Sequence, residues 1–123
     1  MKKAKPEIQI KRVYEPAAET DGKRFLVDRL WPRGISKESL RLAGWLKDIA
    51  PGDGLRRWFG HSPRKWNGFQ KRYQAELAAA PDRWHPLIEA ATEGKVTLLF
   101  SARDLEQNNA VVLKRFLEEK LKR

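Results

Sequence analysis

The sequence has 123 residues, a formal net charge of +10 and no cysteine. This length fits one domain with its own core, and the absence of cysteine excludes disulfides, thiolate metal sites and cysteine nucleophiles. No apolar run approaches the roughly 20 residues of a membrane span, so we expect a cytoplasmic protein that does not associate with membranes.

The positive charge is concentrated in the middle of the chain. Residues 23–72 contain thirteen Lys or Arg and four Asp or Glu, a balance of +9. A positive field of this kind favours anionic partners, either small phosphorylated or carboxylated compounds or nucleic acid. A basic protein without any specific anionic ligand fits the same counts.

The first third of the chain predicts two strands. Residues 8–14 form a partly alternating run between two prolines, and residues 25–27 form a short apolar run that ends before Pro32, which cannot donate to a sheet. The loop 15–22 is short for a helical crossover of about a dozen residues, so the relative direction of the two strands stays open. Ser36 predicts the N-cap of a short helix that ends at residue 40.

The middle third predicts mainly helices. Residues 41–50 fit either a continued helix or an extended segment that ends at Pro51, and Gly44 favours the extended form. Residues 52–60 predict a short helix, and the run His61-Ser62-Pro63 predicts the start of a longer one through residue 80. Asp82 is expected to cap the next helix, which Gly94 ends.

The last third predicts a central strand and a final helix. Residues 96–100 are apolar nearly throughout, as in a strand covered on both faces. Asp104 with Gln107 resembles a capping box, which predicts a helix from there to about Lys122. Strand, charged tip and helix thus occur twice, at 25–40 and 96–121. We therefore predict one α/β domain over residues 1–123, with a small, mainly parallel sheet flanked by helices, in which strands 25–27 and 96–100 are parallel neighbours.

Polar side chains follow both of these strands. Because the carboxyl ends of parallel strands meet at one edge, and because arginines and helix N-termini bind anions, we expect an anion pocket there. An alternative is that Asp28 pairs with an arginine and Ser36 only caps its helix. The candidate ligand-binding residues are Arg29, Trp31, Arg33, Gly34, Arg103, Asn108 and Asn109.

Three residues are candidates for catalysis, namely Asp28, His61 and Ser101. A histidine with an ordinary pKa near 6.5 can act as a general base at neutral pH, although His61 also fits an ordinary polar loop. No zinc-helix spacing, phosphate-binding Gly-rich loop or nucleophile elbow is present. We expect no metal and no cofactor, and whether the protein is an enzyme stays open.

Tryptophans are frequent, and three of them lie among basic residues. Trp45, Trp58 and Trp66 are interleaved with arginines and lysines between residues 45 and 72. Aromatic side chains among basic ones can stack on the bases of single-stranded nucleic acid. Tryptophans at helical spacing also serve as core residues, and this is the interpretation we favour.

Several motifs resemble the YeaO-like bacterial proteins, which belong to a larger domain of unknown function. The most specific is the run from Asp28 to Gly34, Asp-Arg-Leu-Trp-Pro-Arg-Gly. The others are residues 11–14, 21–24, 26–27, 45–51, 55–61, 72–73, 76–77, 97–102 and 108–110. The resemblance implies a small cytosolic α/β protein and no established activity. Longer relatives carry a cysteine-containing motif after the last strand, which this chain lacks, and Gly52 stands where the family usually has a serine.

Three functional hypotheses follow. The first is a small anion-binding protein, with or without catalysis on a phosphorylated or carboxylated compound. The second is a basic module that binds nucleic acid, and the third is a non-catalytic protein-interaction domain. The sequence leaves the oligomeric state open.

Overall fold

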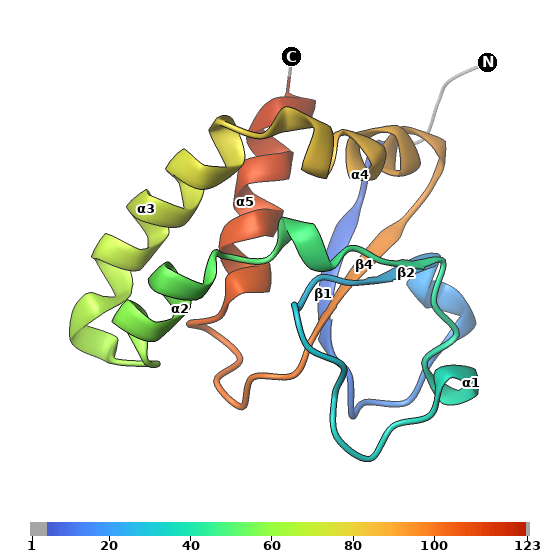
Figure 1. The fold of residues 1–123 in the computed structure, drawn as a ribbon. Coiled ribbons are helices and arrows are strands. Elements are labelled where there is room, and N and C mark those ends of the chain that lie inside the picture. Colours follow the sequence, from blue (N-terminus) through green and yellow to red (C-terminus); the bar gives the residue numbers. More distant parts are fainter. Residues whose placement is uncertain (1–4, 123) are drawn as a thin grey trace.

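A four-stranded parallel sheet forms the centre of the protein in the computed structural model, which describes residues 5–122 (Figure 1). Its strands lie in the order β1 (Ile8–Arg12), β4 (Val96–Phe100), β2 (Lys23–Leu26) and β3 (Gly44–Trp45). All strand pairs are parallel, so the direction of the first strand, left open by the sequence, is settled. The predicted parallel pairing of the second and last strands is confirmed.

One face of the sheet packs against helices. These are α4 (Pro81–Glu93) and α5 (Asn109–Leu121), while α3 (Trp66–Ala78) packs on both of them and the shorter α2 (Asp53–Phe59) packs on α3 (Figure 1). The larger hydrophobic core lies between this helical layer and the strands. Every residue of β4 is buried, as its apolar sequence predicts for a central strand.

Loops cover the opposite face of the sheet. Leu26 and Leu99 form a second, smaller core there with Val13 and with Leu40 of the short helix α1 (Lys37–Leu40). Ser36 caps α1 as predicted, since its hydroxyl accepts the Ser39 N–H. The sheet is therefore covered on both faces, by helices on one and by loops on the other.

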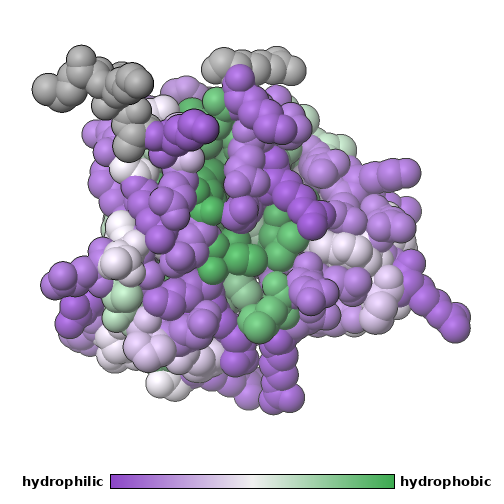
Figure 2. All heavy atoms as spheres, turned by 180° about the vertical axis from the view of Figure 1, so that it is seen from behind, coloured by the Kyte–Doolittle hydropathy of each residue, from purple (hydrophilic) through white to green (hydrophobic). Residues whose placement is uncertain are grey.

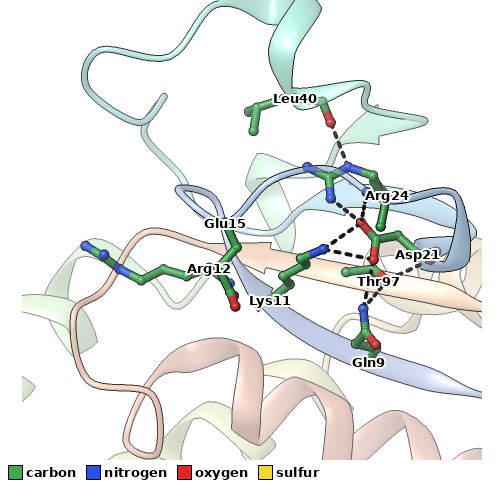
Figure 3. Close-up of polar contacts among 9 residues, drawn as sticks. Gln9, Lys11, Arg12, Glu15, Asp21, Arg24, Leu40 and Thr97 are labelled. Atoms are coloured by element: carbon green, nitrogen blue, oxygen red, sulfur yellow. Dashed lines mark hydrogen bonds and ion pairs between the residues drawn. The ribbon is translucent and has the colours of Figure 1, made fainter.

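A buried ion cluster joins three strands on the loop-covered face (Figure 3). The carboxylate of Asp21 accepts hydrogen bonds from Lys11 at 3.1 Å, Arg24 at 2.6 Å and Gln9 at 3.1 Å. Thr97 of β4 donates its hydroxyl to the Asp21 carbonyl at 2.7 Å. Because the partners come from β1, β2 and β4, Asp21 fixes these strands relative to one another.

The rear of the molecule is largely hydrophilic, with a narrow hydrophobic strip near its middle (Figure 2). A groove of about 590 Å³ lies between the start of β1 and the end of α5. Ile8 and Leu121 line it together with charged residues of both signs, namely Arg115, Glu118, Glu119 and Lys122. The apolar surface in this groove is therefore bounded closely by charge.

The segment from 41 to 50 is extended in part. Residues Gly44–Trp45 form β3, in agreement with the preferred interpretation, but Lys47–Ile49 then form a single 3-10 turn before Pro51. Residues Asp53–Phe59 form the predicted short helix, and Gly60 ends it in the left-handed conformation.

Two helix starts differ from the predicted ones. Residues Pro63–Lys65 form a 3-10 turn in which Ser62 makes no side-chain cap bond, so α3 begins only at Trp66. Helix α4 begins at Pro81, so Asp82 lies inside its first turn and does not cap it. In both cases a proline at the first position sets the backbone direction without help from a capping side chain.

The last helix also begins later than the pattern of Asp104 and Gln107 predicts. Asp104 accepts the N–H groups of Glu106 and Gln107 within a loop, and this loop precedes the helix. The true N-cap of α5 is Asn108, whose side chain accepts the Val111 N–H at 3.0 Å.

Candidate functional site

The carboxyl ends of three neighbouring strands open onto one cavity of about 970 Å³. Its walls come from the segments that follow β1, β2 and β4, together with α2 and the residues around it. The lining residues are Arg12, Tyr14, Asp28, Arg29, Leu30, Trp31, Pro32, Arg33, Ala50, Pro51, Arg56, Arg57, Phe59, His61, Phe69, Ser101, Ala102, Arg103, Asn108 and Asn109.

Asp28 is held at this edge by donors from two other segments. Its Oδ2 accepts the backbone N–H of Ser101 at 2.9 Å and the Ser101 hydroxyl at 2.8 Å. Its Oδ1 accepts the side-chain amide of Asn109 at 3.1 Å, and the same amide donates to the Val27 carbonyl. Asp28 therefore makes no ion pair with an arginine within residues 5–122, contrary to the structural alternative considered for it.

Arg12 is oriented without a carboxylate. Its Nε donates to the carbonyls of Ser101 at 3.3 Å and Ala102 at 3.0 Å, and its guanidinium lies 4.7 Å from the centre of the Tyr14 ring. Tyr14 in turn donates its hydroxyl to the Arg33 carbonyl at 3.1 Å. These contacts leave the positive charge of Arg12 without a carboxylate partner among residues 5–122.

The other cavity arginines fall into two groups. Arg29 and Arg56 share one carboxylate oxygen of Asp53, at 3.7 Å and 3.1 Å. Arg33, Arg57 and Arg103 are exposed, and none of them belongs to an ion pair within the described part of the chain.

His61 lines the cavity but lies apart from the other two catalytic candidates. It has a left-handed backbone with φ 57°, is exposed, and has its ring centre 5.8 Å from that of Phe59. No hydrogen bond joins it to Asp28 or Ser101, whereas these two residues contact each other directly. The structure therefore brings Asp28 and Ser101 together and places His61 on another wall.

The remaining ligand-binding candidates are Asn108, Trp31 and Gly34, and they differ in whether their polar atoms already have hydrogen-bond partners within the protein. Asn108 is buried and occupied, because its amide donates to the Asp104 carbonyl while its oxygen caps α5. Trp31 lines the cavity and donates its indole N–H to the Ile35 carbonyl at 2.7 Å. Gly34 provides a turn with φ 73° but is not among the lining residues.

Sequence analysis missed part of the cavity wall, mainly Arg12, Tyr14, Arg56, Arg57 and Phe59. Arg12 ends the first strand and Tyr14 follows it, so their position became predictable only once that strand was known to be parallel to the others. The two helical arginines line the cavity because α2 packs on α3 beside it, and this packing has no local sequence signal.

The loop between β4 and α5 is organised by its own backbone contacts. The N–H groups of Gln107 and Glu106 both donate to Asp104, and these hydrogen bonds lower the pKa of its carboxyl. The loop therefore holds Arg103 next to a locally fixed turn at the cavity mouth.

Neither a metal centre nor a membrane segment is found in residues 5–122. No group of three or more His, Asp or Glu side chains there is arranged to hold a metal ion. No helix of this part combines the length and apolar character needed to cross a membrane.

Comparison with known proteins places the chain among uncharacterised relatives. Residues 7–123 match the family described as the "Inactive DUF488-N3 subclade". The uncharacterized protein YeaO of Escherichia coli (strain K12) is 46% identical over 106 residues, which cover 86% of this chain and 92% of that protein. The uncharacterized protein Rv3073c of Mycobacterium tuberculosis (strain ATCC 25618 / H37Rv) is 38% identical over 113 residues, 89% of this chain and 92% of its own. No solved structure matches.

Proposed function

The chain belongs to the inactive DUF488-N3 subclade, which confirms the predicted YeaO-like family of unknown function, and on this premise we propose that it binds a small phosphorylated or carboxylated anion without converting it. The binding site is the cavity at the strand tips. The family description supports binding over catalysis, and so does the absence of cysteine, since the sequence resembles longer relatives that carry a cysteine motif after the last strand.

The observation that carries the proposal is the unbalanced charge of the cavity. Six of its lining residues are arginines, and among the residues that line it the one carboxylate is Asp28. That carboxylate accepts its hydrogen bonds from Ser101 and Asn109 and forms an ion pair with none of the six arginines. Arg29 and Arg56 pair only with the exposed Asp53, which does not line the cavity. An anion would relieve the repulsion between the guanidinium groups and accept their donors.

The size and lining of the cavity support a ligand larger than an inorganic ion. A volume of about 970 Å³ lies at the upper end of the roughly 300–1,000 Å³ typical of small-molecule sites. Tyr14 and Leu30, which line it, are 47% and 65% exposed. Exposed apolar side chains beside arginines suit a ligand with a ring or aliphatic part next to its anionic group.

The contacts of the catalytic candidates also support binding. The Ser101 hydroxyl is engaged with Asp28, and His61 reaches neither of them. A serine and an aspartate that hold the strand tips together have a sufficient structural role without proton transfer.

The nucleic-acid alternative would need aromatic faces free for stacking. All five tryptophans are half-buried. Trp58 is covered by Arg72, with 3.8 Å from guanidinium carbon to ring centre, and by Lys65 at 5.1 Å. This arrangement favours a small ligand over a single strand.

A thermal-shift screen tests the proposal. Phosphate, sulfate, nucleotides and sugar phosphates are added to the wild type and to the variants Arg33→Ala, Arg103→Ala and Arg83→Ala. Because a ligand that binds only the folded state raises Tm, at least one anion should stabilise the wild type and the Arg83 variant. The exposed Arg83 lies on α4 outside the cavity, so its variant matches the charge loss of the other two.

In the Arg33 and Arg103 variants the stabilisation should shrink strongly. If no anion raises the Tm of the wild type, or if all three variants respond as the wild type does, the cavity is not an anion site. Tight binding of short DNA or RNA that survives moderate salt would favour the nucleic-acid hypothesis instead.

A further inference from the structure

The cavity arginines are divided into two groups by their contacts, and the division points to the class of ligand. We propose that they form two anion subsites, one open and one closed by the side chain of Asp53, so that the protein selects ligands with two anionic groups. This inference rests on the proposed function and deepens it. The open subsite is defined by Arg12, Arg33 and Arg103, and the closed subsite by Arg29 and Arg56. The sixth cavity arginine, Arg57, belongs to neither subsite, because it has no contact with Tyr14 or with Asp53 among the hydrogen bonds and ion pairs of residues 5–122.

The open subsite is held together around Tyr14. Arg12 lies over the Tyr14 ring, and the Tyr14 hydroxyl bonds to the Arg33 backbone. Arg12 also bonds to the carbonyls of Ser101 and Ala102, which directly precede Arg103. None of the three arginines has a carboxylate partner for its guanidinium within residues 5–122, so an anionic group can bind them without displacing anything.

The closed subsite already contains a negative charge. One oxygen of Asp53 lies 3.1 Å from Arg56 Nη2 and 3.7 Å from Arg29 Nε. The Arg29 Nε atom is buried and has no hydrogen-bond partner in the described part of the chain, since 3.7 Å is too long for one. Arg29 thus carries a desolvated donor that its resident carboxylate does not satisfy.

Asp53 competes only weakly with an anionic ligand for Arg29 and Arg56. Its side chain is 59% exposed, and exposed ion pairs contribute little to stability because water and salt screen them. A phosphate or carboxylate entering from the cavity side can therefore displace it and give Arg29 an acceptor. A ligand with a single anionic group binds at the open subsite alone. A second anionic group on the same ligand adds binding energy only by contacting Arg29 and Arg56 of the closed subsite.

Isothermal titration calorimetry on the full chain tests this proposal with defined probes. Inorganic phosphate is compared with pyrophosphate, and fructose 6-phosphate with fructose 1,6-bisphosphate, so that two spacings between anionic groups are sampled. In the wild type, at least one two-group probe should bind about tenfold or more tighter than its one-group counterpart. Arg56→Ala should remove most of this difference, whereas the control Arg83→Ala should keep it.

Asp53→Asn should strengthen binding of the two-group probe by about two- to fivefold, the range expected when an exposed ion pair no longer competes. Binding of the one-group probe should change much less. Asp82→Asn is the matched control, because Asp82 is also an exposed acid in the first turn of a helix but lies on α4.

The outcomes separate the two proposals. If the wild type binds no probe, the proposed function fails, and this inference with it. If one- and two-group probes bind equally, or if Asp53→Asn behaves as Asp82→Asn does, the anion site stands as a single site and the two-subsite proposal is wrong.

Discussion

Ser101 donates two hydrogen bonds to the same oxygen of Asp28, one from its backbone at 2.9 Å and one from its hydroxyl at 2.8 Å. Asp28 follows β2 and Ser101 follows β4, so this pair joins the tips of two neighbouring strands. Asn109, the first residue of α5, completes the connection from the other carboxylate oxygen. One side chain thus sets the relative positions of three cavity walls.

Replacing Asp28 by Ala should destabilise the protein by about 1–3 kcal/mol, because the Ser101 and Asn109 donors lose their acceptor. Removal of the negative charge should at the same time strengthen anion binding in the cavity. Urea denaturation gives the free energy of unfolding, and calorimetry with phosphate gives the affinity. Unchanged stability would show that these hydrogen bonds do not hold the strand tips.

The Asp21 cluster should make stability depend on acid pH. Burial would raise the pKa of Asp21, but hydrogen bonds from the Ala18 N–H, Lys11 and Arg24 outweigh it and lower the pKa to about 2. A depressed pKa adds stability that is present above the ordinary value near 4 and is lost as pH falls through about 2. We expect Asp21 to account for a loss of about 2 kcal/mol over this interval, measured by urea denaturation at several pH values.

Asp21→Asn should abolish that part of the pH dependence. At neutral pH it should also cost about 3–5 kcal/mol, because Arg24 and Lys11 are left without their counter-charge in a buried site. The exposed Asp82→Asn serves as the control. A variant with wild-type pH dependence would contradict the assignment to Asp21.

Tyr73 should make stability depend on alkaline pH. Burial, with smaller contributions from Asp28 and Glu76, raises the pKa of its phenol far above the ordinary value. The native state therefore keeps a proton that the unfolded chain loses above pH about 10, and stability should fall as pH rises beyond that value. Tyrosinate absorbance from Tyr73 should appear only together with loss of helical circular dichroism.

Tyr73→Phe should lack this late absorbance change. It should also lose about 1–2 kcal/mol at neutral pH, since the Tyr73 hydroxyl donates to the buried Ile49 carbonyl at 2.6 Å. Ionisation of Tyr73 in the folded protein near pH 10 would contradict the prediction.

Substitution by alanine should have opposite effects on stability at Gly22 and at Gly54. Gly22 has φ 65°, and a Cβ there would collide with the Lys95 carbonyl, so Gly22→Ala should cost about 2 kcal/mol or more. Gly54 lies in α2 with open space around its Cα, so Gly54→Ala should be neutral or stabilise by up to about 1 kcal/mol. Thermal unfolding of both variants checks the pair, and a tolerated alanine at 22 would refute the collision.

The sequence predicts well those features that depend on local pattern. The buried strand β4 follows from a continuous apolar run, and the short helix after Ser36 follows from a capping side chain. The prediction that Asp28 and Ser101 lie at one edge needed only the repeated order of strand, polar tip and helix.

The features that were missed depend on contacts between distant segments. The position of Arg12 depends on β1 lying beside β4, a partner near the other end of the chain. The start of α5 was predicted at Asp104 because Asp104 and Gln107 resemble a capping box, whereas the N-cap is Asn108. In the helix that begins at Asn109, Ala110, Leu113 and Leu117 are buried in the core, a tertiary contact that the local capping pattern does not reveal.

The strand order has a consequence for synthesis of the protein. β4 lies between β1 and β2, with Ile8 opposite Val96, yet it is the last strand to leave the ribosome. Until then β1 has no strand to pair with, and the edge of β2 that pairs with β4 stays unpaired. A nascent chain that has emerged only through α4 therefore exposes an unfinished sheet, and we expect its folding to be delayed until residues 96–100 arrive.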